Sequence, residues 1–252
     1  MIKGESERDF MKSDITILGV RIDNFSVREI KEKISYFLED SSRQKFAATL
    51  NPEILLKAHR DEKYKDILNS ADLNVCDGFG LKLVSFLRGR KIRARFAGAD
   101  LVDFLLELAE DKRHRILVVS AQNSLSAPAE IEQAIRRKYP NLSAKSEYFS
   151  PGQDFFKNGI INQAEIVFVN FGAPEQEKFI FENRTKFPNA KILVGIGGTF
   201  DFLTGKIRRA PCFLRAIGLE WLWRLMQEPK RFRRIWNAVV LFPVISLLEK
   251  KS

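Results

Sequence analysis

The feature that most constrains the fold is a regular alternation of short apolar runs with amphipathic segments of helical period. Runs rich in Val, Ile, Leu and Phe are expected to form strands at 15–22, 45–50, 72–76, 115–121, 144–149, 165–172 and 191–197. Helical patterns lie between them, at 26–40, 52–59, 61–69, 78–88, 99–111, 127–138, 153–162 and 175–185. This alternation is typical of a three-layer α/β domain with a mainly parallel sheet. Ligands of such domains bind beyond the carboxyl ends of the strands, so the residues that follow each strand are the first candidates for a site.

A change of pattern after Thr199 divides the chain. No further strand is expected there, and the basic stretch TGKIRRAP leads into two helical segments, 217–227 and 231–249, on either side of Pro229. The sequence therefore predicts three parts: a polar N-terminal extension over 1–14, expected to be disordered, an α/β domain over 15–204, and a basic helical appendage over 205–252.

The cationic residues are concentrated in that appendage. The chain has a formal net charge of +10, and the window from Gly205 to Trp236 holds nine Lys or Arg against two Glu, a net +7. A regional excess indicates an anionic partner more strongly than a diffuse one does. The stretch EWLWRLMQEPKRFRRIW in this window also holds all three tryptophans. Such a mixture suits nucleic acid, a membrane surface, or packing on the rest of the fold.

Cysteine usage and the N-terminal stretch indicate a reducing compartment. Cys76 and Cys212 form no CxxC pair, and MIKGESERDFMKSD is too polar for a secretory signal. The longest apolar run, Ile235 to Leu248, is interrupted by Pro243, whereas a membrane-spanning helix needs roughly 20 apolar residues. We therefore expect a cytoplasmic protein that does not cross a membrane.

Polar residues follow two of the strands predicted in the N-terminal half. In AATLNPEI, Thr49 and Asn51 end a strand directly before a helix N-terminus, which favours a polar or anionic ligand. In NVCDGFG, Asp77 ends a strand beside Gly78 and Gly80, which allow close backbone approach. A carboxylate there is well placed as a general base. Helix capping by Asn51 and an ordinary Asp-Gly turn are the alternatives, and spacing alone does not decide between them.

Two further candidates follow strands in the C-terminal half. VNFGAPEQEKFI places Gln176 in the first turn of a helix, where its amide can hydrogen-bond a sugar. In ILVGIGGTFDF, Gly197 and Gly198 resemble a phosphate-cradling turn, because backbone N–H groups without side chains can approach a diphosphate. The turn is not a full dinucleotide fingerprint. Asp201 is expected either to bind ribose hydroxyls or to cap the next turn.

The sequence offers few groups for a metal ion. His59 and His114 have no Cys or His neighbour at ligand spacing, and Asp-x-Asp, the usual grip on a nucleotide-bound divalent cation, does not occur. A phosphate-binding enzyme without a metal must neutralise charge in another way, and arginine is the obvious substitute. We therefore expect neither a metal nor another cofactor.

Six motifs, taken together and in order, resemble one known family. They are TLNPE, NVCDGFG, RFAGADL, FGAPEQEKFI, GIGGTFDFLTGKIRRAP and GLEWLWRLMQEPKRFRR. In this combination the chain, from about Ile15 to Arg234, is similar to the WecG/TagA/CpsF family, glycosyltransferase family 26. The resemblance implies a Rossmann-like fold and a hexosyltransferase that moves an N-acetylmannosamine-type or related sugar from a UDP-sugar donor. The implied acceptor is undecaprenyl diphosphate carrying GlcNAc or another first sugar, in polysaccharide or teichoic acid biosynthesis, with inversion at the anomeric carbon and no divalent metal.

The resemblance also assigns expected roles to individual residues. Asp77 matches the family's catalytic base, and Thr49 matches a hydroxyl near the reaction centre. Other matches are residues that line the pocket, namely Asn51, Arg95 and Gln176, and arginines of the appendage that reach the diphosphate, namely Arg224, Arg231 and Arg234. Asn170 departs from the family pattern, which has a small or apolar residue there, and this leaves donor specificity open.

Elementary chemistry agrees with these expectations. In a single inverting displacement a base takes the proton of the acceptor hydroxyl while UDP leaves from the opposite face, and partial burial would raise the pKa of Asp77 toward that task. The leaving diphosphate gains charge and needs donors. The N–H groups of Gly197, Gly198 and Thr199 and the appendage arginines are expected to supply them, so the site would be complete only with the appendage folded over it.

The appendage is also expected to bind an anionic membrane on its cytoplasmic face. Arg231 and Arg234 share a helix face, while apolar side chains follow at Trp236, Val239, Val240 and Phe242. Each cation near anionic lipid contributes about 1 kcal/mol, and apolar side chains insert shallowly.

Two other classes remain alternatives at this stage. A nucleic-acid-binding α/β protein would explain the basic appendage but not the strand-end motifs, so we expect no nucleic-acid partner. An NAD-dependent oxidoreductase lacks its fingerprint in the first βα turn. The sequence leaves open which sugars are used and whether a homo-oligomer forms through the surface that the appendage would cover.

Overall fold

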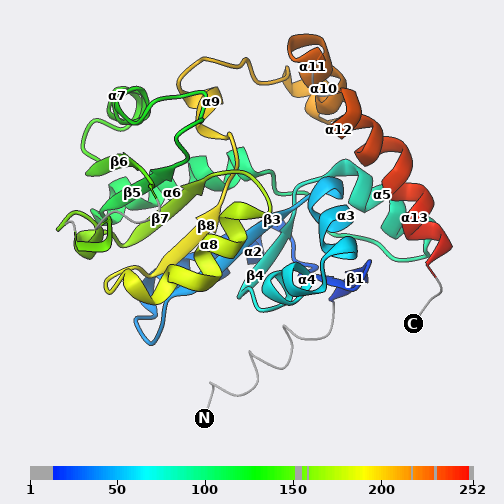
Figure 1. Ribbon diagram of the computed structural model, residues 1–252, viewed down its shortest axis with the longest axis horizontal. Coiled ribbons are helices and arrows are strands. Elements are labelled where there is room, and N and C mark those ends of the chain that lie inside the picture. Colours follow the sequence, from blue (N-terminus) through cyan, green and yellow to red (C-terminus); the bar gives the residue numbers. More distant parts are fainter. Residues whose placement is uncertain (1–13, 151–154, 158, 217, 230–231, 250–252) are drawn as a thin grey trace.

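A six-stranded parallel sheet forms the centre of the computed structural model, which describes residues 14–150, 155–157, 159–216, 218–229 and 232–249 (Figure 1). Its strands lie side by side in the order β4 (Leu73–Cys76), β3 (Lys45–Leu50), β8 (Ile192–Gly195), β7 (Ile166–Asn170), β5 (Ile116–Ser120) and β6 (Ala144–Tyr148). Every pairing within this sheet is parallel. The carboxyl ends of the strands therefore share one edge, as the strand–helix alternation predicts.

Helices cover both faces of the sheet, so the predicted three-layer, Rossmann-like architecture is confirmed. One hydrophobic core contains side chains of α3 (Pro52–Arg60), α4 (Glu62–Asn69), α5 (Phe79–Leu87) and α8 (Glu175–Asn183). The other core contains side chains of α2 (Val27–Glu39), α6 (Gly98–Lys112) and α7 (Pro128–Lys138). All strands of this sheet except the edge strand β6 are buried on both sides. This burial explains why they appear in the sequence as largely apolar runs.

The predicted strand over 15–22 is wrong in one respect. It forms a separate antiparallel hairpin of β1 (Ile15–Ile17) and β2 (Val20–Ile22). Leu18 and Gly19 join the two strands with φ values of 52° and 76°. Two consecutive residues with positive φ are the signature of a tight two-residue hairpin turn. The stretch ITILGVRI hides such a turn because Leu, and not Asn or Gly, occupies the first turn position.

The predicted helix over 153–162 is also wrong for the part that the structure describes. There the chain forms two short 3₁₀ turns, η1 (Phe155–Lys157) and η2 (Ile161–Gln163). Phe155 and Ile161 are buried in the core, and Phe155 packs edge-on against Phe149 with ring centroids 5.3 Å apart. Aromatic packing, not helical periodicity, therefore places this segment.

In the part of the C-terminal region that the structure describes, the chain forms the predicted helices and two additional short ones. After β8 a turn leads into α9 (Phe200–Leu203), and a loop then leads into α10 (Cys212–Ala216). The predicted segments correspond to α11 (Glu220–Gln227) and to the run of α12 (Phe232–Trp236), η5 (Asn237–Leu241) and α13 (Phe242–Leu248). No strand occurs after Thr199 among the described residues, as expected.

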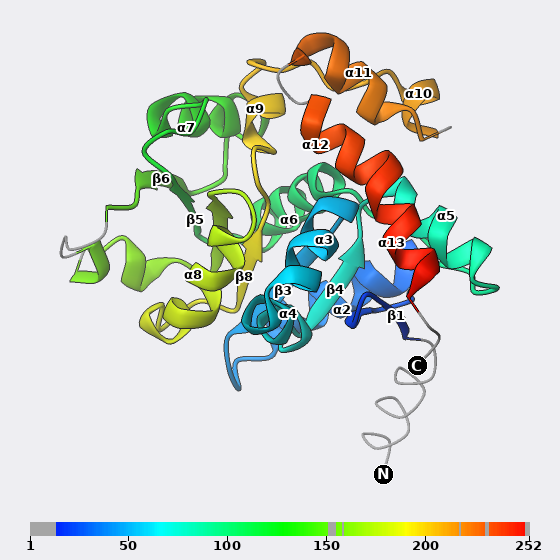
Figure 2. The same cartoon turned by 45° about the vertical axis from the view of Figure 1, so that its right-hand side comes forward.

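The appendage is folded back along the α/β domain. The run from α12 to α13 crosses α3 and lies beside α5 (Figures 1 and 2). Phe242 is fully buried in the core that contains α3 and α5. At its far end, Glu249 accepts a hydrogen bond from the Leu18 backbone N–H (3.1 Å) and pairs with Arg88 (3.3 Å). Among the described residues, no helix has both the length and the apolar character needed to cross a membrane.

Candidate active site

A cavity of about 720 Å³ lies where the strands β3, β4, β7 and β8 end and the appendage crosses above them. Eleven of the twelve expected site residues line it: Thr49, Asn51, Asp77, Arg95, Gln176, Gly197, Gly198, Thr199, Asp201, Arg224 and Arg234. The twelfth, Arg231, lies outside the described residues. The α/β domain and the appendage thus contribute to one cavity.

Three side-chain oxygens converge at the start of α6. An ideal Cβ placed on Gly98 would lie 3.5 Å from Thr199 Oγ1, 3.6 Å from Asp77 Oδ2 and 3.6 Å from Thr49 Oγ1. Any larger residue at Gly98 would fill the space that these oxygens surround. Thr49 Oγ1 donates to the Gly195 carbonyl at 3.3 Å, so its orientation is fixed by the neighbouring strand. The arrangement leaves the Asp77 carboxylate as the basic group of this cluster.

The pKa of Asp77 is raised to about 6, and burial of its carboxyl group is the main cause. The negative charges of Glu220 and Asp100 raise the pKa further, while the Gly98 N–H and Arg95 lower it. A carboxylate with a pKa near 6 is deprotonated at neutral pH and still accepts a proton readily. This is the condition that a general base must meet.

Arg95 connects the site to the appendage. Its Nη2 lies 3.5 Å from Glu220 Oε2, and both side chains are largely buried. Glu220 begins α11, so the first turn of this appendage helix is paired directly with a residue of the α/β domain. Since Glu220 also raises the pKa of Asp77, the appendage contributes to the electrostatics of the site.

Gln176 is buried and holds two loops of the cavity together. Its Oε1 accepts hydrogen bonds from the Gly197 N–H (2.7 Å) and the Gly172 N–H (3.2 Å), and its Nε2 donates to Glu177 Oε1 (2.6 Å). Both ends of the amide are therefore used within the protein. In this structure Gln176 shapes the loops after β7 and β8, whereas the sequence suggested contact with a sugar.

Asn51 caps α3, as one of the two sequence interpretations expected. Its Oδ1 accepts from the backbone N–H groups of Glu53 (3.0 Å) and Ile54 (3.1 Å). The side chain nevertheless lines the cavity, so capping and ligand contact are compatible at this position.

The glycine turn after β8 has fewer open N–H groups than its sequence suggests. The Gly197 N–H donates to Gln176 and the Thr199 N–H donates to the Gly197 carbonyl at 2.8 Å. Asp201 is buried and accepts from Ser126 Oγ at 2.7 Å, which favours a structural role for it in this structure. Of the three backbone N–H groups that were expected to contact the diphosphate, those of Gly197 and Thr199 are used within the protein. The Gly198 N–H is therefore the candidate donor that is left.

Of the three appendage arginines expected to reach the diphosphate, the two that the structure describes already have partners. The guanidinium of Arg224 lies over the Phe202 ring, 4.8 Å from its centroid. Arg234 donates from Nε (2.9 Å) and Nη2 (2.7 Å) to one oxygen of Glu53. Glu53 therefore occupies the guanidinium that the sequence assigns to a diphosphate, and an anionic ligand would have to compete with it.

Sequence reasoning missed several residues that line the cavity. Asn123 and Ser124 follow β5, and Glu53 and Glu220 stand at the appendage side. Asn123 and Ser124 stand just past a strand, so the strand-end criterion used for the other candidates identifies them as well. Glu53 and Glu220 gave no such signal, because acidic residues in a first helical turn are common as helix-stabilising groups.

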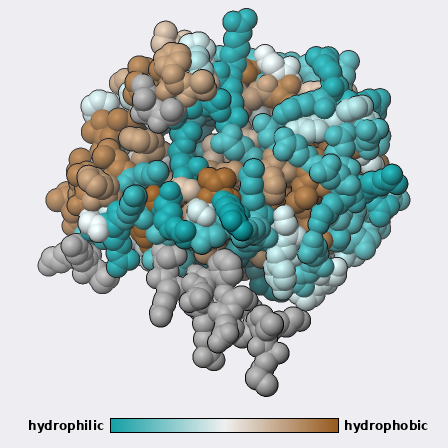
Figure 3. All heavy atoms as spheres, turned by 180° about the vertical axis from the view of Figure 1, so that it is seen from behind, coloured by the Kyte–Doolittle hydropathy of each residue, from teal (hydrophilic) through white to brown (hydrophobic). Residues whose placement is uncertain are grey.

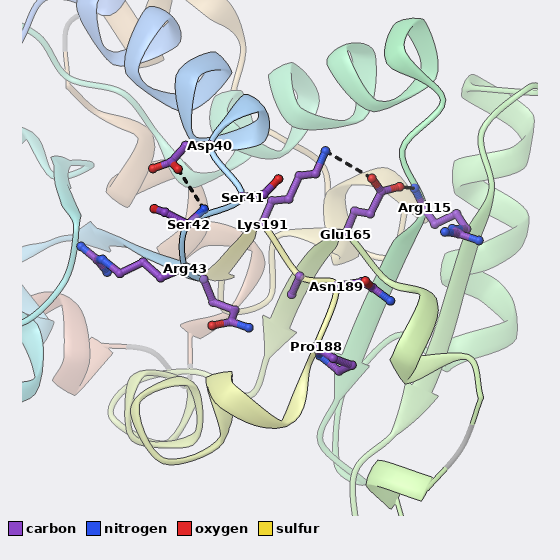
Figure 4. A pocket seen from close by; sticks show the side chains of 11 residues that line it. Asp40, Ser41, Ser42, Arg43, Arg115, Glu165, Pro188, Asn189 and Lys191 are labelled. Atoms are coloured by element: carbon purple, nitrogen blue, oxygen red, sulfur yellow. Dashed lines mark hydrogen bonds and ion pairs between the residues drawn. The ribbon is translucent and has the colours of Figure 1, made fainter. Parts of the chain in front are cut away.

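A second, smaller hollow of about 300 Å³ lies at the opposite edge of the sheet, near the amino ends of the strands. Figure 4 shows its lining side chains, including Arg43, Arg115 and Lys191. Lys191 pairs with Glu165 at 3.4 Å, and Arg43 pairs with Asp72. Within the described ranges, no group of three or more His, Cys, Asp or Glu side chains is placed to hold a metal ion.

Comparison with known proteins decides the family. The model of the glycosyl transferase WecG/TagA/CpsF family matches residues 15–252. The chain belongs to this family. The family expected from the sequence motifs is thereby confirmed, and so is the expected enzyme class, a glycosyltransferase, over the two alternatives.

Several relatives of this chain align with it over most of its length and most of their own. A protein of Bacillus spizizenii strain W23 is 35% identical over 78% of this chain and 76% of its own. A protein of Bacillus subtilis strain 168 is 34% identical over 87% of this chain and 86% of its own. One from Staphylococcus aureus strain MRSA252 is 27% identical over 94% of each chain. All three are named N-acetylglucosaminyldiphosphoundecaprenol N-acetyl-beta-D-mannosaminyltransferase.

Proposed function

We propose that this chain transfers an N-acetylmannosamine-type sugar from a UDP-sugar donor to undecaprenyl-diphosphate-linked GlcNAc. The names of the relatives support the sugar and the acceptor. The single observation that carries the chemistry is the raised pKa of Asp77, about 6, in a cavity where hydroxyl oxygens of Thr49 and Thr199 converge with its carboxylate. The reaction would contribute to a cell-surface polymer such as teichoic acid.

The proposed reaction is one inverting displacement. The acceptor hydroxyl oxygen forms a bond to the anomeric carbon of the donor sugar while the bond from that carbon to the UDP oxygen breaks. Asp77 takes the hydroxyl proton, and UDP leaves with the bonding electron pair. Because the acceptor attacks from the side opposite to UDP, the configuration at the anomeric carbon inverts.

Charge on the leaving diphosphate is proposed to be neutralised by arginine. Arg224 and Arg234 line the cavity, and guanidinium groups match phosphate oxygens in geometry and charge. Gly198 adds a backbone donor. The proposal therefore includes turnover that does not depend on a divalent metal ion.

The direct test is UDP release from a panel of UDP-sugars with a GlcNAc-diphosphate-lipid acceptor, in the presence of EDTA. Asp77→Asn is expected to lower kcat by about 10²- to 10⁴-fold, the usual contribution of general base catalysis. Asp66→Asn is the matched control, because Asp66 is exposed on α4, away from the cavity. Full activity of Asp77→Asn would refute the assigned base, and loss of wild-type turnover in EDTA would refute the role of the arginines.

We further propose that the protein lies on the cytoplasmic surface of an anionic membrane. Fourteen of the eighteen exposed large apolar side chains among the described residues lie on α5 or in the appendage. Figure 3 shows hydrophobic atoms gathered along the side of the molecule that holds these helices in Figure 1. Exposed apolar patches beside cationic residues are typical of interfacial binding.

Liposome flotation tests this placement. Replacing Trp236, Val244 and Leu247 with Gln should reduce binding to anionic vesicles by at least tenfold, since these three side chains are about half exposed. A control that replaces the exposed Val27 and Tyr36 with Gln on α2 should bind as the wild type does. Equal binding by all three proteins would contradict the proposal.

A further inference from the structure

Glu177 carries a buried carboxyl group that the proposed chemistry does not use. It is fully buried on α8, directly after the cavity-lining Gln176. Its Oε1 accepts a hydrogen bond from Gln176 Nε2 at 2.6 Å, and its Oε2 accepts one from the hydroxyl of Tyr64, on α4, at 2.8 Å. Burial raises the pKa of Glu177, and these two hydrogen bonds oppose the rise. A buried carboxyl group costs free energy unless donors satisfy it, and here both of its oxygens have a donor.

The contact with Glu177 fixes the orientation of the Gln176 amide. Because Gln176 Oε1 accepts from the N–H groups of Gly197 and Gly172, its Nε2 is turned toward Glu177. A flipped amide would place Nε2 against two N–H donors and Oε1 against an oxygen of Glu177. Each buried polar group left without a partner costs about 1–3 kcal/mol. Glu177 therefore determines which end of the amide faces the loops after β7 and β8.

The end of β8 is shaped to receive this amide. An ideal Cβ on Gly195 would lie 2.9 Å from Gln176 Nε2 and 3.0 Å from its Cδ, so a larger residue there would displace the side chain. Gly197, which donates to Gln176, has a φ of 53°, a conformation that favours glycine. Two glycines of the sequence GIG thus serve the same contact, one by leaving space and one by turning its N–H toward the amide.

The turn that Gln176 holds carries two groups of the proposed chemistry. The next residue, Gly198, has the N–H group that is the candidate donor to the diphosphate. The Thr199 N–H donates to the Gly197 carbonyl at 2.8 Å, and Thr199 Oγ1 converges with the Asp77 carboxylate at the start of α6. A displacement of Gly197 is therefore passed on to both groups within two residues.

Resting on the proposed function, we infer that Glu177 is a positioning residue for the transfer reaction. Glu177 orients the amide of Gln176, the amide holds the Gly197 turn, and the turn sets the places of the Gly198 N–H and the Thr199 hydroxyl. Glu177 itself does not line the cavity, so it acts only through Gln176. Donors that are fixed before the reaction act on the charge that develops on the leaving group, so the effect belongs in kcat.

Stabilisation of the core alone does not account for this carboxyl group. Apolar side chains of similar size in place of Glu177 and Tyr64 would fill the same space, and such replacements of buried polar groups are often neutral or stabilising. They would leave Gln176 Nε2 without its acceptor. The orientation of the amide, and not the filling of the core, is therefore what requires an oxygen at this position.

The test compares Glu177→Leu with Glu177→Gln in the full-length chain. Glu177→Leu leaves Gln176 Nε2 without an acceptor, so kcat should fall by about tenfold to a hundredfold, as expected when reacting groups are misplaced by about 1 Å. KM for the acceptor should stay unchanged. Glu177→Gln keeps an oxygen that can accept from Gln176, so its kcat should remain within about threefold of the wild type. Should Glu177→Leu fail to fold because the Tyr64 hydroxyl loses its partner, Tyr64→Phe combined with Glu177→Leu removes that group and takes its place.

Hydrogen exchange of the Gly172 and Gly197 backbone N–H groups, followed by NMR, separates positioning from a loss of stability. Both groups donate to Gln176 Oε1. In Glu177→Leu their exchange should accelerate by at least about tenfold, while the N–H groups within β7 and β8 keep their protection. In Glu177→Gln the exchange of both glycines should match that of the wild type.

Glu165→Leu is the matched control. The carboxylate of Glu165 also has close partners, the Arg115 N–H at 3.1 Å and His114 Nδ1 at 2.9 Å, but it lies at the opposite edge of the sheet. This variant should lose stability and keep both kcat and the slow exchange of Gly172 and Gly197.

The inference is overturned if Glu177→Leu keeps the kcat of the wild type, or if its kcat falls without faster exchange at Gly197. It is also overturned if Glu177→Gln loses as much activity as Glu177→Leu does. Failure of the proposed function is a different result, because the wild type would then glycosylate no acceptor while the exchange of the two glycines could still be compared.

Discussion

The sheet and the appendage are held in place by different forces. In the strands at the centre of the sheet, such as β7 and β8, every side chain is buried, whereas α11 and α12 contain no buried side chain among the described residues. The appendage is attached instead through the buried Phe242 and through ion pairs such as Arg95–Glu220 and Arg234–Glu53. The Arg234–Glu53 pair is the more exposed of the two, and an exposed ion pair contributes little and is screened by salt. The cavity thus combines a rigid floor with a more easily released cover.

The largest effect is expected in the sheet. Phe168 is fully buried in β7 and packs edge-on against Phe200, with ring centroids 5.6 Å apart. Phe168→Ala should lower the free energy of unfolding of the whole domain by about 3–5 kcal/mol, because it leaves a cavity in a closely packed core. Denaturant unfolding followed by circular dichroism measures this. An effect below 1 kcal/mol would mean that the sheet is packed less tightly than described.

The same substitution in the appendage should act locally. Phe242→Ala removes the buried anchor of α13, so hydrogen exchange is expected to accelerate at least tenfold over 232–248 while β3, β7 and β8 stay protected. Glycosyltransferase activity should fall with it. If protection of the strands fell equally, the two regions would unfold as one unit and the comparison would fail.

Asp77 is expected to reduce stability at neutral pH. Its folded pKa, about 6, lies above the value of 3.8 for a free carboxyl, so between these values the folded state binds more protons than the unfolded state. Stability therefore falls as pH rises from about 4 to about 6. Asp77→Asn removes this cost and should be more stable than the wild type by about 1–2 kcal/mol at pH 7, allowing for the solvent-facing side of the carboxyl group. Near pH 3 the two proteins should unfold at similar denaturant concentrations, and a stability gain that persists there would contradict the assigned ionisation.

The smallest effect is expected at the contact between Glu53 and Arg234. Glu53→Gln releases the guanidinium for a phosphate, so UDP should bind up to about fivefold more tightly, the range that an exposed ion pair allows. Glu53 also pairs with Lys57 at 3.3 Å. Lys57 does not line the cavity, so it is not expected to replace Arg234 as a phosphate ligand. Calorimetric titration of UDP measures the gain, and the gain should disappear when Arg234→Gln is also present. Weaker UDP binding by Glu53→Gln would show instead that Glu53 positions Arg234 for the ligand.

The sequence was most informative where one physical rule applies without competition. Burial on both faces makes the strands of a parallel sheet continuous apolar runs, and residues such as Thr49 and Asp77 at their ends meet at one edge. Leu18 conceals the hairpin of β1 and β2, because Leu rarely adopts the positive φ found there. The spacing of apolar residues along the sequence therefore does not reveal the turn between β1 and β2.

The sequence did not predict which groups individual side chains contact. The amide of Gln176 could bond a sugar or two loops, and only the positions of Gly172 and Gly197 decide for the loops in this structure. The pairing of Arg234 with Glu53 joins residues 181 positions apart. Charge patterns indicate that such groups need a partner, but the fold determines which one is within reach.

The pH dependence of kcat/KM tests the central claim, that the appendage completes a site in which Asp77 is the base. For the wild type the rate should rise with pH and level off above an inflection near 6. Glu220→Gln removes a negative charge that raises the pKa of Asp77 and releases Arg95, which lowers it, so the inflection should move to lower pH. An inflection that stays at the same pH in both proteins would contradict the claim that α11 is part of the active site.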